Sequence, residues 1–114
     1  MNWIQLNSIT QLEDIAKTSY ERPQVIFKHS TRCSISMVAN RRLNDADQPA
    51  NTDFYFLDLL QYRDISNAIA EKFSVYHESP QVLLIHKGEC IYDESHSSIY
   101  MRDIEEELSR ITSV

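Results

Sequence analysis

Glycine is nearly absent from this chain of 114 residues, and Gly88 is the single example. A phosphate-binding loop of the Walker or dinucleotide type needs several glycines close together, so neither kind of nucleotide site is expected. Cysteine is also scarce: only Cys33 and Cys90 are present, too few for a fold that disulfides hold together. The four histidines show no metal-ligand spacing such as His-x-x-x-His, so we expect no bound metal.

Positive charge is in short supply, because 11 basic residues face 17 acidic ones and the net charge is −6. Binding to nucleic acid or to an anionic membrane surface depends on clustered Lys and Arg, so we expect neither kind of partner. The longest aliphatic run, residues 82–85, is far shorter than the roughly 20 residues that span a bilayer. The first residues lack the basic and apolar regions of a signal peptide, which favours a cytoplasmic protein with reduced cysteines.

Helical and strand patterns alternate along the chain, and no linker-like segment divides residues 1–114, so we expect a single domain. Strands are predicted at about residues 3–6, 25–29, 54–57, 81–86 and 90–93. Helices are predicted at about residues 9–16, 34–45, 62–73 and 100–111. The order (βα)-βαβα-ββα indicates an α/β three-layer sandwich with a mixed central sheet and flanking helices.

Three local details follow from the same patterns. The turn over residues 87–89 predicts a hairpin, in which Gly88 is free to take a positive φ. Either Ser97 or Ser98 is expected to cap the last helix. In the helix over 34–45, the residues expected to face the sheet are Ile35, Val38, Ala39 and Leu43.

Cys33 follows the predicted second strand and stands where the next helix begins. The free N–H groups and the positive dipole end of a first helical turn favour a thiolate, which the amides of Ile35 and Ser36 could bind. Arg32 adds a positive charge beside it. Because the thiolate is the nucleophilic form, the position predicts a reactive cysteine; the alternative is a small buried apolar residue.

Three short motifs stand out: His29-Ser30-Thr31-Arg32-Cys33-Ser34-Ile35-Ser36, Glu78-Ser79-Pro80-Gln81 and Ser95-His96. Together with the order of elements, they resemble the YtxJ-like bacilliredoxin family of monothiol redox proteins. The resemblance extends from Trp3 to the last helix. It implies a thioredoxin-like fold, and thiol–disulfide exchange with proteins that carry bacillithiol as a mixed disulfide.

The resemblance also implies roles for individual residues. Cys33 matches the attacking cysteine, and Ser36 matches the position of the resolving cysteine in dithiol thioredoxins. Pro80 matches the cis-proline that faces the reactive sulfur, where it and the backbone of Ser79 would hold an extended substrate segment. On its residues alone, Ser36 could equally be a first-turn helix residue whose hydroxyl is hydrogen-bonded.

Two positions depart from the family pattern: Ser34 stands where many members have Pro, and Phe27 stands where thioredoxins bury an acid. The basic side chains near the site, Lys28, Arg32 and His96, are candidate contacts for an anionic thiol. His96 could also be an ordinary loop histidine.

The sequence therefore predicts a monothiol–disulfide oxidoreductase that uses no cofactor and takes a low-molecular-weight thiol such as bacillithiol as co-substrate. Its expected partners are thiolated proteins and that thiol. The alternative is a thioredoxin-fold binding module without redox turnover. Cys90 is expected to be structural and to lie well over 10 Å from Cys33 at about 3.3 Å per strand residue, too far for a disulfide.

Overall fold

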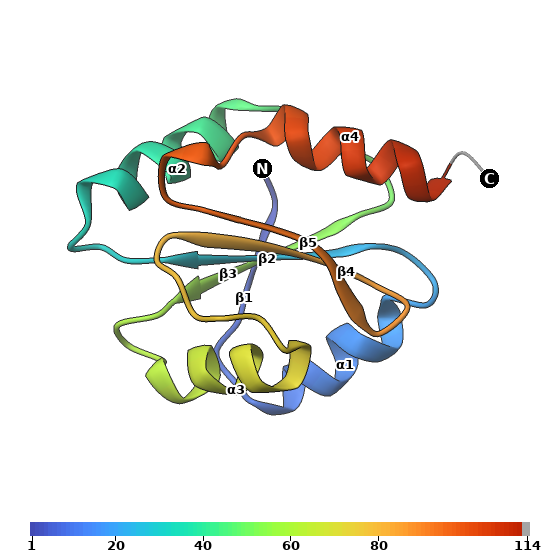
Figure 1. The fold of residues 1–114 in the computed structure, drawn as a ribbon, viewed down its shortest axis with the longest axis horizontal. Helices are drawn as coiled ribbons and strands as arrows, with labels where there is room; N and C mark the ends of the chain where they lie inside the picture. The colour runs from blue at the N-terminus through green and yellow to red at the C-terminus, as the bar shows by residue number, and fades with distance from the viewer. Residues whose placement is uncertain (113–114) are drawn as a thin grey trace.

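The computed structural model describes residues 1–112, which form one five-stranded sheet with helices on both faces (Figure 1). The strands are β1 (Trp3–Gln5), β2 (Gln24–His29), β3 (Asp53–Asp58), β4 (Gln81–His86) and β5 (Glu89–Ser95). The helices are α1 (Thr10–Thr18), α2 (Ser34–Asp45), α3 (Arg63–Phe73) and α4 (Met101–Thr112), with a short 3₁₀ helix η1 (His96–Ser98) before α4. This order confirms the predicted fold class.

The strand order in the sheet is β1-β3-β2-β4-β5. Strands β1, β3 and β2 are parallel, whereas β4 runs antiparallel to β2 and β5 antiparallel to β4. All six residues of β2 are buried, because this strand lies in the middle of the sheet. Lys28 pairs with Gln81, so the carboxyl end of β2 lies beside the beginning of β4. The loop after β2 and the loop before β4 therefore lie next to each other, at the same end of these two central strands.

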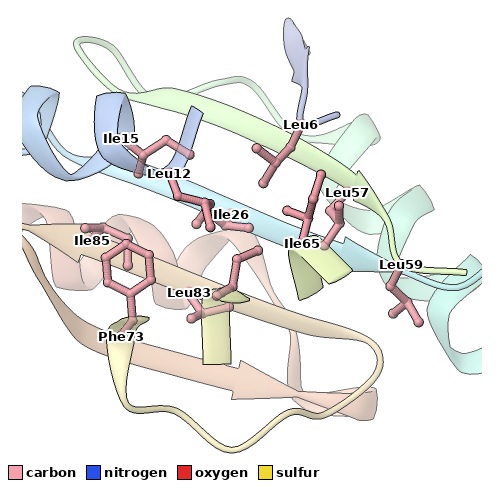
Figure 2. Close-up of a cluster of buried hydrophobic side chains, with 11 residues drawn as sticks. Leu6, Leu12, Ile15, Ile26, Leu57, Leu59, Ile65, Phe73, Leu83 and Ile85 are labelled. Atoms are coloured by element: carbon pink, nitrogen blue, oxygen red, sulfur yellow. The ribbon is translucent and has the colours of Figure 1, made fainter. Parts of the chain in front are cut away.

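Two hydrophobic cores lie on opposite faces of the sheet, since neighbouring residues of a strand point to opposite sides. Helices α1 and α3 cover one face, and α2 and α4 cover the other (Figure 1). Figure 2 shows the core on the α1 and α3 side, which comprises Leu6, Leu12, Ile15, Ile26, Leu57, Leu59, Ile65, Ile69, Phe73, Leu83 and Ile85. The core on the α2 and α4 side comprises Val25, Phe27, Ala39, Leu43, Phe54, Val82, Leu84, Ile99, Met101, Ile104 and Leu108.

Aromatic rings concentrate beneath α2. Phe27 is fully buried and stacks on Trp3 at 5.8 Å between ring centroids. Phe54 and Phe56 pack edge-on against Trp3 at 5.9 and 5.6 Å. Phe27, which the resemblance sets at the position of the buried thioredoxin acid, belongs here to an apolar aromatic cluster.

The hairpin between β4 and β5 turns at Lys87 and Gly88, whose φ angles are 51° and 80°. Two successive positive φ angles are typical of a tight type I′ turn. The turn is tied to the end of α1, because Lys87 N–H donates to the carbonyl of Ser19 at 3.0 Å and Gly88 N–H to its hydroxyl at 2.8 Å. The predicted hairpin is confirmed.

The predicted cap of the last helix is wrong. Ser97 and Ser98 belong to η1, and α4 begins only at Met101. The chain makes a separate 3₁₀ turn after β5, so the first hydrogen bonds of α4 go to the carbonyl of Tyr100 instead. Across residues 1–112, no helix combines the length and the apolar character needed to cross a membrane.

Candidate active site at the start of α2

Cys33 is the N-cap residue of α2, with an extended backbone conformation (φ −113°, ψ 120°). Its thiol is free and partly exposed. Its N–H donates to the carbonyl of Ser30 at 3.3 Å, and its own carbonyl accepts the N–H of Met37 at 3.1 Å. Among the described residues, no side-chain capping bond from the sulfur to the first turn of α2 is present. The predicted position of Cys33 at a helix start is confirmed, and its sulfur is uncommitted.

Ser36 lies one turn later and is fully buried. Its Oγ accepts the N–H of Ser30 at 2.9 Å and lies 2.7 Å from Nδ1 of His29. The hydroxyl is thus hydrogen-bonded within the fold, as in the second of the two interpretations left open by the sequence. A direct part in the chemistry stays a prediction.

The buried face of α2 consists of Ser36, Ala39 and Leu43. Ile35 and Val38 were expected to face the sheet, but they are 43% and 50% exposed, so that expectation is wrong. The two hydrogen bonds of Ser36 explain the difference, because they allow a polar residue to take the inward position that periodicity alone gives to an apolar one.

His29 is the residue at this site that the sequence analysis missed. Only 3% of it is exposed, and its ring packs at 5.7 Å from Phe27 and 5.3 Å from Phe56. Burial lowers the pKa of His29 below its ordinary 6.5, although the nearby Asp58 carboxylate opposes this shift. Two spacings in the sequence could have indicated that His29 and Ser36 both face the core. His29 shares a strand face with Phe27, and Ser36 lies three and seven residues before Ala39 and Leu43, on the same helix face.

Pro80 lies at the same edge of the sheet as Cys33. The Ser79–Pro80 peptide bond is cis, as the resemblance implies. The carbonyl of Pro80 accepts the N–H of His96 at 3.0 Å, and Nε2 of His96 lies 3.3 Å from a carboxylate oxygen of Glu78. His96 therefore lies beside Pro80, and its contact with an anionic thiol stays a prediction. Glu78, which holds its ring, was not foreseen in that role.

Lys28 does not belong to the site's surface. It is fully buried on the face of β2 opposite His29, where its ammonium donates to the carbonyl of Ser66 at 3.2 Å and contacts Nδ1 of His77 at 3.3 Å. Burial lowers its pKa to about 8. The predicted direct contact of Lys28 with an anionic thiol is wrong, because the side chain points into the core. Arg32, by contrast, is exposed next to Cys33.

Cys90 lies at the other end of the sheet. Cys90 pairs with Ile85, and Ile85 pairs with Gln24, the residue at which β2 begins. Cys33, by contrast, comes after the residue at which β2 ends. The Cys90 thiol donates to the carbonyl of Tyr92 at 3.3 Å, and burial raises its pKa to about 11. Both cysteines are free.

Within residues 1–112, no three potential ligand side chains gather in a way that could hold a metal ion.

Comparisons with known proteins agree with this geometry. Residues 4–104 match the family described as monothiol bacilliredoxin BrxC. A solved structure described as a candidate oxidoreductase with a thioredoxin fold is 33% identical, with 90% of each chain covered and a TM-score of 0.79.

Two thioredoxins show the same fold at low sequence identity. The protein from Malassezia sympodialis is 17% identical, with 96% of this chain and 90% of that chain covered and a TM-score of 0.71. The protein from Trypanosoma brucei brucei is 16% identical, with 99% and 93% covered and a TM-score of 0.73. The fold is thus that of thioredoxin.

Proposed function

Because the chain belongs to the monothiol bacilliredoxin family, we propose that it restores protein thiols by removing bacillithiol from mixed disulfides. A thiol redox role follows from the family, and the choice of small thiol and the route are the proposal. The observation that carries it is the pair Cys33 and Ser36: a free thiol begins α2, and a hydrogen-bonded hydroxyl stands where dithiol relatives place a second thiol.

The reaction consists of two exchanges. In the first, the Cys33 thiolate attacks the bacillithiol sulfur of the mixed disulfide. A new disulfide forms between Cys33 and bacillithiol, the original S–S bond breaks, and the protein cysteine leaves as a thiolate that takes a proton from water. In the second, a free bacillithiol thiolate attacks the bacillithiol sulfur of the adduct. Bacillithiol disulfide leaves, and Cys33 returns to the thiolate.

The groups around Cys33 suit this exchange. Arg32 is exposed and immediately precedes Cys33, so its guanidinium can pair with the carboxylates of an anionic thiol. His96 lies half-exposed at Pro80, where it offers a second contact. Within the described residues, the backbone N–H and carbonyl of Ser79 make no hydrogen bond, which leaves both for an extended substrate segment.

Intact-protein mass spectrometry tests the proposal. The reduced chain is exposed in parallel to bacillithiol disulfide and to glutathione disulfide. We expect one bacillithiol per chain, an adduct that is lost in Cys33→Ala and kept in Cys90→Ala, and much slower modification by glutathione. The released bacillithiol is quantified in the same reaction, which closes the thiol balance.

Two results would contradict the proposal. Equal rates for the two disulfides would show that the chain is not selective for bacillithiol. No adduct on Cys33 at all would favour the alternative, a binding module that holds a partner without exchanging thiols.

A further inference from the structure

We propose that His29 is a positioning residue for Cys33 and that it acts through the side chain of Ser36 and the backbone of Ser30. The inference rests on the proposed function, in which Cys33 is the attacking thiol. His29 is the last residue of β2, and its carbonyl accepts the N–H of Leu59 at 3.1 Å, so this hydrogen bond fixes its backbone. The imidazole is therefore a firm anchor for whatever it binds.

Three short contacts lead from this imidazole to Cys33. Nδ1 of His29 lies 2.7 Å from Oγ of Ser36, and the same oxygen accepts the N–H of Ser30 at 2.9 Å. The carbonyl of Ser30 then accepts the N–H of Cys33 at 3.3 Å. A hydroxyl has one proton and two lone pairs, so Ser30 takes one lone pair and His29 fixes the remaining orientation of the group.

Burial makes these contacts consequential. Ser36, His29 and Ser30 are exposed by 0%, 3% and 7%, so water cannot readily replace a lost partner. Removing the imidazole would leave the Ser36 hydroxyl short of a buried hydrogen bond. The hydroxyl is then free to rotate, and the turn from Ser30 to Cys33 loses the support on which its geometry depends.

Burial keeps this link intact at neutral pH, against the effect of the nearby charge. Burial keeps His29 neutral, and the charged group that acts on it is the Asp58 carboxylate on the neighbouring strand β3. A neutral imidazole can either donate or accept a hydrogen bond at Nδ1, and the Ser36 hydroxyl can correspondingly accept or donate. The pair therefore needs no change of protonation to hold.

The turn matters for the reaction because it sets where the Cys33 sulfur lies relative to the free N–H groups that begin α2. Those groups stabilise a thiolate and thereby the nucleophile. Without His29, we expect the pH profile of Cys33 alkylation to move to higher pH, with about a tenfold lower rate at neutral pH. A purely structural role would lower the unfolding temperature and leave the pH profile of the folded molecules unchanged.

Three substitutions at His29 distinguish the atoms of the ring. His29→Asn keeps an amide group at the position of Nδ1, whereas His29→Gln carries its amide one bond further and His29→Phe has a ring without nitrogen. Alkylation of Cys33 by iodoacetamide is followed against pH by peptide-resolved mass spectrometry, with folding checked by circular dichroism. We expect the Asn variant to stay within about twofold of the parent, and the Gln and Phe variants to lose about tenfold.

Ser36→Ala removes the same hydrogen bond from the other side. It therefore tests the inference independently, even if His29→Phe does not fold. It should shift the pH profile as far as His29→Phe, and the double variant should shift no further, because both changes break one link. Unshifted profiles, additive shifts, or an Asn variant no better than Phe would overturn the inference. A parent Cys33 no more reactive than a cysteine in an unfolded peptide would instead overturn the proposed function.

Discussion

Replacing Lys28 with Met should stabilise the fold at neutral pH. The ammonium of Lys28 is fully buried, and its two hydrogen-bond partners, the carbonyl of Ser66 and Nδ1 of His77, carry no negative charge. A buried charge without a countercharge costs free energy relative to the same charge in water. Met has a similar length and fills the site without that cost.

The pKa shift gives the magnitude. Burial lowers the pKa of Lys28 from 10.5 to about 8, a difference of 10.5 − 8, or about 2.5 units. At 1.36 kcal/mol per unit, the protonated side chain costs about 3 kcal/mol of folding free energy. Little is lost in exchange, because the Ser66 hydroxyl still lies 3.2 Å from Nδ1 of His77.

Because the pKa of Lys28 is lowered in the folded state, the direction of the pH dependence is fixed. Below about pH 8, Lys28 is protonated in both states and the cost is present in full. Between about 8 and 10.5, the unfolded chain holds a proton that the native chain has released, so native stability rises with pH. The advantage of Lys28→Met should therefore be about 3 kcal/mol at neutral pH and should vanish as the pH approaches 10.5.

Urea unfolding of the parent and of Lys28→Met across this pH range measures the difference directly, since other titrating groups affect both chains alike. Lys17→Met is the control, because Lys17 is exposed and such changes usually stay within about 0.5 kcal/mol. A Lys28→Met variant less stable than the parent at neutral pH would refute the reasoning. So would a difference that does not change with pH.

Three further predictions follow from the site and the hairpin. Iodoacetamide should label Cys33 much faster than Cys90 at neutral pH, since burial raises the pKa of Cys90 to about 11; equal rates in peptide-resolved mass spectrometry would contradict this. Ser36→Cys should give a chain that loses two hydrogens on oxidation instead of keeping a thiol adduct, which intact mass distinguishes. Gly88→Ala should cost about 1 kcal/mol in urea unfolding, because its φ is +80° and the new Cβ would meet the Tyr20 hydroxyl at 3.0 Å. Gly88→Asn should cost less, since Asn tolerates that φ, and a cost equal to that of Ala would speak against backbone strain.

The order of helices and strands was predictable from the sequence because hydrophobic periodicity and turn residues agree along most of the chain. The bounds of α2, Ser34–Asp45, and of β4, Gln81–His86, match the predicted ranges. Cys33 was predictable as a reactive residue because a strand precedes it and a helix begins beside it, and this is a local pattern that a sequence displays directly. The place of Pro80 in the site was instead implied by the resemblance to the bacilliredoxin family.

The side-chain environments of Lys28 and Ser36 were not predictable in the same way. Lys28 is charged, yet it lies in the core, because a fully buried strand exposes neither of its faces. Ser36 is polar, yet it turns inward, because His29 and the backbone of Ser30 satisfy its hydroxyl. Each case depends on partners that are close in space, and such a partner can override the preference of the single residue.

Several features of the fold act together against internal resolution of an adduct on Cys33. Ser36 cannot act as a second thiol, and its hydroxyl is engaged by His29 and Ser30. Cys90, the other thiol, lies at the opposite end of the sheet and is held protonated by a pKa raised to about 11. Phe27, buried and apolar, offers no carboxyl group that could assist a second thiol. An adduct on Cys33 must therefore wait for a thiol from solution, and the rate of its release should increase in proportion to the concentration of that thiol.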